Sequence, residues 1–287
     1  MKRKLVVLLL VLFMILSTTV AFADVAVGDV VVSLGEDLSE DQKDAILNEF
    51  DPPEDALMIT TTNEEEHQYL EGIVPVAQIG SNALSSVMVT YTESGSGINV
   101  ETNHITYITE QAYSNSLITA GVEDADIKIT APFDVSGTAA LTGIMKAYEA
   151  SSGEEISDDV KKVANEEMVT TSDLAEDIGD QEASDLINEI KKQIAEQSPQ
   201  STEEVREIVI NVTNNFNLEL TDEQIEKLVS LFDRMRTLDI DWNQVGDQLE
   251  NIANKAGEFL ESEEGQGLLD SISNFFTRLF NWLRDLF

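Results

Sequence analysis

The chain contains no cysteine among its 287 residues and only two histidines, His67 and His104. The lack of cysteine excludes disulfides, thiol nucleophiles, iron–sulfur clusters and cysteine-ligated zinc. The two histidines lie 37 residues apart and no HExxH spacing occurs. Glu64 and His67 have a spacing that can share a metal on one helix face, although a solvated acidic helix face explains the same residues. The sequence favours the solvated face.

Basic residues are also scarce, because 17 Lys and Arg stand against 55 Asp and Glu, a formal net charge of −38. A surface this acidic repels phosphate backbones, which excludes nucleic-acid binding. It also repels anionic lipid headgroups and anionic wall polymers unless divalent cations screen them. We interpret the charge as a device that keeps an extracellular protein soluble. A cationic partner and loosely bound Ca²⁺ remain as alternatives.

The amino terminus has the three parts of a cleavable secretory signal peptide. Positive residues 2–4 precede an unbroken apolar run at 5–16, and Ala21-Phe22-Ala23 has the small-x-small pattern of a cleavage site. A membrane anchor is the alternative, because a spanning helix needs about 20 apolar residues. We expect cleavage before Asp24, which leaves 264 residues with 14 basic and 55 acidic side chains and no cysteine to carry a lipid. The expected location is secreted or extracellular, with possible attachment to the cell envelope.

Residues 24–150 mix strand and helix signals and predict a mixed α/β domain. β-Branched runs predict strands at 25–34 and 57–62. Ser39 and Gln42 have the capping-box spacing of a helix start, and Asn63 is a candidate cap for a second, short helix. Thr109 and Gly121 bracket a third helix.

Three further strands are predicted at 87–92, 98–102 and 126–131. The Gly- and Ser-rich segment 93–97 predicts a hairpin between the first two. Pro132 should end the third, and Ser136 is then a candidate N-cap for a helix over 137–148. The order β-α-β-α-β-β-α-β-α predicts parallel neighbours packed under helices with one antiparallel pair. The expected fold class is α+β, with a mixed sheet layered with helices in the N-terminal half and an all-helical C-terminal half.

Strand patterns vanish after residue 151, and Pro199 is the only later proline. Helices are predicted at about 157–168, 181–197, 202–215, 221–238, 241–262 and 268–287, with a hinge at 198–201. Thr221 and Gln224 repeat the capping-box spacing. We therefore divide the chain into a signal peptide at 1–23, a mixed domain at 24–150, a helical region at 151–267 and an amphipathic helix at 268–287.

No catalytic constellation stands out from the sequence. A Ser–His–Asp triad with His104 stays open, because triads are recognised by geometry, but no G-x-S-x-G motif occurs. The acidic pairs 154–155 and 158–159 could supply the carboxylates of a glycosidase, although their place in a linker or first helical turn better suits the helix dipole. We expect no catalytic residues and no cofactor. A wall-directed hydrolase that uses carboxylates is the alternative.

The turn at residues 131–140 is a candidate anion site. Its free backbone N–H groups and hydroxyls, at Ser136, Gly137 and Thr138, can cradle an anion. The turn lacks the lysine and glycine spacing of a phosphate loop. The favoured alternative is that small residues here permit close packing of helix and sheet.

The last twenty residues predict an aromatic-rich amphipathic helix. Its apolar side is the candidate contact surface for a membrane or partner and comprises Phe275, Phe276, Leu279, Trp282, Leu283 and Leu286. Its side-chain charges cancel, so it lacks the usual cationic face of a membrane-surface helix. Packing on the helical half, self-association, an envelope partner and a membrane surface all remain open.

Five strings spread along the chain resemble one known family: VGDVVVSLGEDLSEDQK at 27–43, AQIGSNALSS at 77–86, GSGINVETNHIT at 95–106, TAPFDVSGTAALTGIMKAYE at 130–149 and LVSLFDRMRTLDIDWNQV at 228–245. The chain is similar to the YpuA-like family of exported Firmicute proteins, which is catalogued as a domain of unknown function, number 1002. The resemblance implies a secreted or envelope location and supplies no activity, cofactor or site residue. We therefore expect a non-enzymatic binding protein with a C-terminal contact helix, and a Ca²⁺-responsive acidic module is a further alternative.

Overall fold

A computed structural model describes residues 26–261, with side chains at all of these except 77–78 and 253–261. The predicted signal peptide at 1–23 and the predicted amphipathic helix at 268–287 lie outside the described residues. Where residues are described, no helix is both long and apolar enough to cross a membrane.

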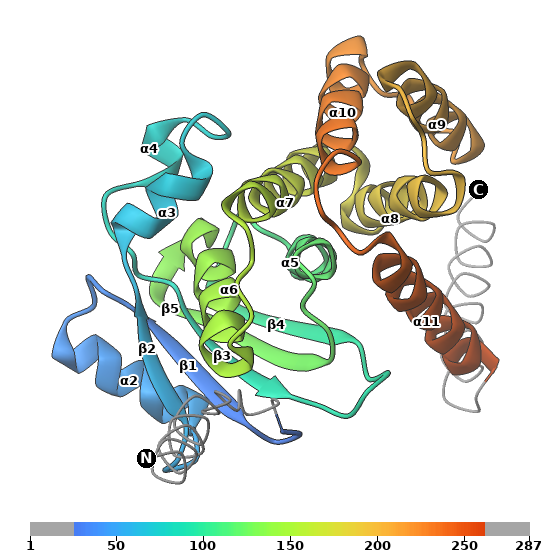
Figure 1. Cartoon of the computed structure of the whole chain (residues 1–287). Helices are drawn as coiled ribbons and strands as arrows, with labels where there is room; N and C mark the ends of the chain where they lie inside the picture. Colours follow the sequence, from blue (N-terminus) through green and yellow to red (C-terminus); the bar gives the residue numbers. More distant parts are fainter. Residues whose placement is uncertain (1–25, 262–287) are drawn as a thin grey trace, which may run out of the picture.

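The N-terminal half is built on a five-stranded mixed sheet (Figure 1). The strands are β1 (Val30–Gly35), β2 (Leu57–Thr61), β3 (Ser86–Tyr91), β4 (Ile98–Ile105) and β5 (Ala125–Val135), in the order β2-β1-β3-β5-β4. The outer pairs β1–β2 and β4–β5 are parallel, and β3 runs antiparallel to β1 and β5. Helices α2 (Glu40–Phe50) and α5 (Glu110–Thr119) connect the two parallel pairs. This arrangement confirms the predicted mixed sheet.

The predicted hairpin at residues 87–102 is wrong, because β5 lies between β3 and β4. The loop 93–97 crosses the start of β5, where the Asp124 carboxylate accepts the N–H groups of Gly95 and Gly97 at 3.0 and 2.5 Å. β5 buries Ile127 and Ile129, whereas most residues of β4 are exposed or half-buried. The apolar strand therefore takes the interior position and the polar strand takes the edge.

Two boundaries around the end of β5 also differ from the prediction. The strand continues through Pro132 to Val135, because β3 pairs only as far as Thr130 and leaves no ladder bond for the proline to break. Gly137, with φ 95°, precedes α6 (Thr138–Ser152) as its N-cap, so Ser136 is not the cap.

Local capping signals place most other helix starts correctly. The boxes Ser39–Gln42 and Thr221–Gln224 both form, and Thr109 caps α5. At α3 (Asn63–Leu70) the cap is Thr62, which forms a box with Glu65, so the predicted Asn63 cap is one residue late.

Helices cover both faces of the sheet. Along β1, Val31 faces the main core under α5 and α6, whereas Val32 faces a smaller cluster under α2. This alternation follows from the two-residue period of a strand. The short α4 (Val76–Ile79) follows α3 and lies beside it.

The C-terminal half is helical as predicted, but its first helix continues to Ile178 and not to the predicted end near residue 168. It comprises α7 (Asp158–Ile178), α8 (Asp180–Gln197), α9 (Thr202–Asn215), α10 (Asp222–Met235) and α11 (Trp242–Glu261). α7 and α8 pack on α5, and one hydrophobic cluster runs from the sheet through α5 into these helices (Figure 1). The change in sequence character near residue 150 is therefore a change of element type around a continuous core.

Candidate functional site

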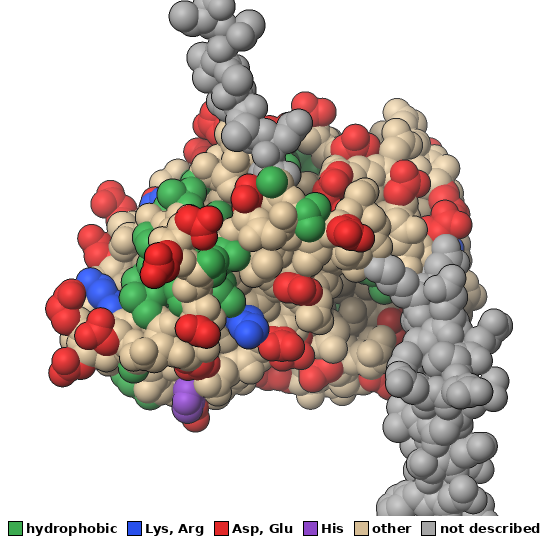
Figure 2. Space-filling model, turned by 90° about the horizontal axis from the view of Figure 1, so that it is seen from below, with side chains coloured by type: hydrophobic (Ala, Val, Ile, Leu, Met, Phe, Trp, Pro, Cys, Tyr) green, Lys and Arg blue, Asp and Glu red, His purple; other side chains and the backbone are tan. Residues whose placement is uncertain are grey.

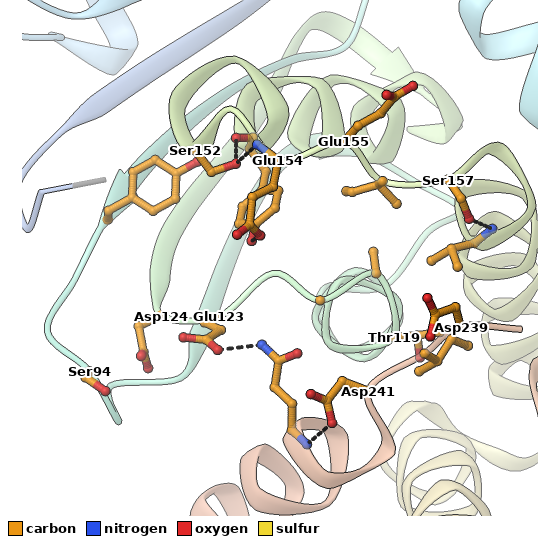
Figure 3. Close-up of a pocket in the computed structure, with 18 of the residues that line it drawn as sticks. Ser94, Thr119, Glu123, Asp124, Ser152, Glu154, Glu155, Ser157, Asp239 and Asp241 are labelled. Atoms are coloured by element: carbon orange, nitrogen blue, oxygen red, sulfur yellow. Dashed lines mark hydrogen bonds between the residues drawn. The ribbon is translucent and has the colours of Figure 1, made fainter. Parts of the chain in front are cut away.

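A large cleft opens where the end of α5, the connection from α6 to α7 and the start of α11 meet (Figure 3). Its volume is about 690 Å³, within the usual range for ligand pockets. Six acidic residues line it, namely Glu123, Asp124, Glu154, Glu155, Asp239 and Asp241. No Lys, Arg or His belongs to its described lining. We call this feature the acidic cleft.

Hydrogen bonds hold three of these acidic residues in place, namely Glu123, Asp124 and Asp241. Gln244 of α11 donates to Glu123 at 2.5 Å, and Asp241 accepts the N–H groups of Asn243 and Gln244 at 3.0 and 3.1 Å. Asp124 is held by the loop that crosses β5. The cleft therefore brings together acidic residues that are distant in the sequence, and hydrogen bonds fix the positions of several of them.

The α6–α7 connection is anchored from behind. Glu149 at the end of α6 accepts the Ile156 N–H at 2.8 Å and pairs with Lys161 at 2.8 Å. Ser157 caps α7 through the Val160 N–H. Figure 3 shows the Glu154 carboxyl directed towards the side of the cleft that carries Glu123, whereas the Glu155 carboxyl points away.

Two tyrosines contribute to the cleft wall. The Tyr148 hydroxyl donates to Glu154 at 3.1 Å, and burial, with the nearby charges of Glu154 and Glu123, raises the Tyr148 pKa to about 12. The Tyr91 hydroxyl lies 2.6 Å from the Ser151 hydroxyl, and burial raises the Tyr91 pKa as well. Both phenols therefore stay neutral at physiological pH, and their rings give the cleft apolar surface.

A buried ion pair lies behind the cleft. Thr119, part of the cleft lining, donates to Glu167 of α7 at 2.5 Å, and Lys191 of α8 lies 2.9 Å from Glu167 and 3.3 Å from the Thr119 hydroxyl. Both charged side chains are 0% exposed. Burial raises the pKa of Glu167 and lowers that of Lys191. Because the lysine is matched by its own glutamate, it leaves the negative charge of the cleft uncompensated.

An adjoining hollow of about 510 Å³ extends the acidic cleft along α11. It shares Glu123, Asp124 and Asp241 with the cleft and adds Asp247. Across residues 26–261, no group of three or more Asp, Glu or His side chains is placed to hold a metal ion. The carboxylates are therefore spread along the cleft and the adjoining hollow.

The predicted anion site at Ser136, Gly137 and Thr138 lies elsewhere, beside a carboxylate of the chain itself. The Thr138 hydroxyl donates at 2.5 Å to Glu66, which is 1% exposed and whose pKa is raised by burial. Tyr113 donates to the Gly137 carbonyl at 2.6 Å, and a Cβ on Gly137 would collide with Tyr113 and Ile105. Close packing is therefore present here, and binding of an external anion stays a prediction.

The histidines and the second acidic pair have local partners. His104, with φ 60° at a register shift in β4, places Nδ1 2.8 Å from Asp134, and both side chains are exposed. His67 Nε2 lies 2.9 Å from the Gly80 carbonyl. Asp158 and Asp159 occupy the first turn of α7, the position suited to the helix dipole. The candidate contact residues Phe275, Phe276, Leu279, Trp282, Leu283 and Leu286 fall outside the described residues.

The sequence did not single out the acidic cleft. Glu154 and Glu155 stand out in the sequence as a pair, but the other acidic residues of the cleft belong to no motif in a chain with 55 acidic residues. These residues are Glu123, Asp124, Asp239 and Asp241. The only available signal was the placement of each acidic group at a boundary between elements. Their meeting depends on how α11 packs against the end of α5.

Comparison with known proteins identifies the family. The family model described as "Protein of unknown function (DUF1002)" matches residues 34–252. The "Uncharacterized protein YpuA" of Bacillus subtilis (strain 168) is 48% identical over 269 residues, which cover 93% of each chain. No solved structure matches. These matches extend over the sheet, the acidic cleft and most of the helical half, and the chain therefore belongs to the DUF1002 family of proteins of unknown function.

Proposed function

We propose that this chain is an exported, non-enzymatic binding protein whose acidic cleft holds the cationic part of a ligand or partner. The observation that carries the proposal is the cleft of about 690 Å³ lined by six acidic residues and, in the described structure, by no basic one. The ligand class follows from charge, because such a cleft concentrates cations and repels anions.

The cleft also has the surface needed to do more than attract counter-ions. Tyr91, Tyr148, Ile156 and Ile240 bring rings and aliphatic groups next to the carboxylates. Low-polarity walls strengthen the attraction between a bound amine and a carboxylate relative to bulk water. An elongated ligand with several amines and a carbon backbone, such as a basic peptide or a polyamine, matches this lining and the adjoining hollow.

The test uses spermine as the probe and calorimetric titration of the secreted protein. Asp239→Asn with Asp241→Asn removes two charges from the cleft but keeps side-chain size and the capping oxygen at Asp241. We expect spermine to bind this double variant at least about fivefold more weakly, because two close charge pairs are lost.

The matched control is Glu203→Gln with Glu207→Gln, which removes two exposed charges from α9, a helix that contributes no residue to the cleft lining. It should bind spermine like the parent protein. Equal weakening by both double variants would show that only overall charge matters and would refute a specific cleft site.

Export and envelope contact form the second part of the proposal. It is supported by the signal-like residues 1–23 and by the amphipathic pattern of residues 268–287. Mass spectrometry of the secreted protein should find Asp24 at the amino terminus. Deleting residues 268–287 should shift the protein among medium, wall and membrane fractions, whereas an unchanged distribution and oligomeric state would contradict a contact role for this segment.

A further inference from the structure

β2 leaves one side of the sheet without a neighbouring strand in the described structure. It is a terminal strand that pairs only with β1 and packs mainly on α6 (Figure 1). Its first two side chains are apolar and exposed, Leu57 at 42% and Met58 at 46%. An apolar strand at the edge of a sheet favours pairing with another chain. We call residues 56–60 the β2 edge.

The pairing of β1 with β2 determines which backbone groups the β2 edge presents. In a parallel pair, alternate residues of each strand bond to the neighbouring strand. The Glu36 N–H, just after β1, donates to the Thr61 carbonyl at 2.9 Å, so the odd-numbered residues of β2 bond to β1. The backbone groups of Ala56, Met58 and Thr60 therefore point away from the sheet.

Two of these outward groups already have partners within the chain. Lys146 of α6 donates to the Thr60 carbonyl at 2.7 Å, and the Ala56 N–H donates to the Pro53 carbonyl at 3.1 Å. The others are the Met58 N–H and carbonyl, the Thr60 N–H and the Ala56 carbonyl, and none of them has a hydrogen-bond partner within residues 26–261. The β2 edge therefore keeps two donors and two acceptors free.

These four groups are complementary to the same four groups of a second copy. When two β2 strands pair antiparallel about a two-fold axis at Met58, each Met58 exchanges both of its backbone hydrogen bonds with the partner's Met58. Each Thr60 N–H then faces the carbonyl of the partner's Ala56. The Thr60 carbonyl and the Ala56 N–H, which are already bonded, face only each other across the axis. The pairing therefore satisfies every free group of the β2 edge.

The side chains match in the same register. Leu57 lies opposite the partner's Ile59, and Ile59 packs on the main core. Two leucines and two isoleucines therefore meet on that face of the sheet, where cross-strand apolar pairs stabilise strand pairing. The two Met58 side chains meet on the opposite face, because successive residues of a strand alternate between faces.

We propose that two copies of this chain pair through their β2 edges, so that their sheets join into one continuous sheet. The β2 edge shares no residue with the acidic cleft. Dimer formation and cation binding therefore succeed or fail separately, and the variant Asp239→Asn/Asp241→Asn should dimerise at least as well as the parent.

The first test is sedimentation equilibrium of the whole mature chain in 0.5 M NaCl, which screens repulsion between two acidic copies. We expect a reversible dimer. Met58→Lys should raise its dissociation constant at least about tenfold, because two ammonium groups then lie opposite each other at the axis. Ile210→Lys is the matched control, since it makes the same charge change at an apolar residue of α9 that is 39% exposed. It should dimerise like the parent.

The second test measures the register and uses the absence of cysteine from the chain. Hydrogen-bonded antiparallel pairs hold their Cα atoms about 5.5 Å apart, which is within the range of a disulfide. Met58→Cys should therefore form a disulfide-linked dimer under mild oxidation. Thr60→Cys is the control, because the two Thr60 positions lie four residues out of register, about 13 Å along the strand. It should stay unlinked.

Any of three results would overturn the proposal. These are a parent chain that sediments only as a monomer in 0.5 M NaCl, a dimer that Met58→Lys and Ile210→Lys leave equally stable, and a disulfide that forms as fast in Thr60→Cys as in Met58→Cys. The second result would assign self-association to another surface, such as residues 268–287. The two cysteine variants keep the test decisive if Met58→Lys fails to fold.

Discussion

Lys191 and Glu167 have fully buried side chains, and among the described residues Glu66 is the other buried acidic group. Lys191 also donates to the Asn115 carbonyl at 2.8 Å, and Asn115 in turn bonds Ser184 at 3.1 Å. The pair thereby ties α5, α7 and α8 together at their junction. The free-energy cost of removing two charges from water exceeds what most buried pairs regain through their mutual attraction. Such a pair therefore fixes the relative positions of the helices more than it stabilises the fold.

Replacing one partner of this ion pair should lower the free energy of unfolding far more than replacing both partners. Glu167→Gln leaves a buried ammonium without its counter-charge and should lower the free energy of unfolding by about 3–5 kcal/mol. Lys191→Met should have a similar effect. The double change Glu167→Leu/Lys191→Met should lie within about 1 kcal/mol of the parent or above it. Urea unfolding of the four proteins tests this, and additive losses in the double variant would contradict it.

Tyr148 gives the cleft a measurable response to alkali. Its phenol ionises near 10 when unfolded and at about 12 when folded. Between these values the folded state holds the extra proton, so stability falls as pH rises from 10 to 12. We expect absorbance at 295 nm to show one fewer late-ionising phenol in Tyr148→Phe. The variant should also lose less stability than the parent between pH 9 and 11, and an identical loss would contradict this role.

At the scale of elements, the turn from β5 into α6 depends on Gly137. Its φ of 95° disfavours any side chain, and a Cβ there would also meet Tyr113 and Ile105. Gly28 has a φ of 93° with nothing within 4 Å of its Cβ position, so it is a matched control. We expect Gly28→Ala to cost about 1 kcal/mol of unfolding free energy and Gly137→Ala roughly 3 kcal/mol or more. Equal losses in denaturant melts would show that the contact does not matter.

The elements that the sequence predicted well are those fixed by neighbours in the chain. Ser39 and Thr221 cap their helices because a capping box needs only four consecutive residues. The Gly- and Ser-rich composition of the loop 93–97 indicates a hairpin, but it carries no information about Asp124. Asp124 follows α5 in the sequence and accepts hydrogen bonds from this loop. Strand order was decided by competition for the buried centre of the sheet, which favours β5 over β4.

The sequence could not predict the acidic cleft either, because its residues are distant in the chain and meet only through tertiary packing. Glu123 and Gln244 form a hydrogen bond across 121 positions of sequence. Neither residue belongs to a motif, and their contact exists only because α11 packs on α8 and reaches the end of α5. The sequence can suggest the candidate anion turn because its residues are consecutive, but it cannot show Glu66, which lies 72 positions from Thr138.

At the scale of the whole molecule, net charge dominates. The formal charge of −38 produces self-repulsion that favours expansion. Figure 2 shows acidic side chains distributed over one face, with few basic ones among them. Screening should relieve this repulsion, because the Debye length falls from about 30 Å at 0.01 M salt to about 3 Å at 1 M.

Added salt should therefore stabilise this protein. We expect 0.5 M NaCl to raise the Tm by roughly 2–8 °C over 0.01 M NaCl, the shift that about 1–2 kcal/mol produces in a chain of this size. The variant Asp239→Asn/Asp241→Asn, which has less charge to screen, should show a slightly smaller increase. Scanning calorimetry measures both, and a Tm that falls with salt would show that attractive ion pairs outweigh repulsion.

The position of β5 between β3 and β4 also determines when the sheet can close during synthesis. A chain that emerges amino terminus first presents β1, β2 and β3 early, and these three can pair at once. β4 then emerges without a partner strand and stays unpaired until α5 and residues 125–135 have been synthesised. Until then the apolar edge of β3 stays open to other chains. This edge is covered only when β5 pairs with β3.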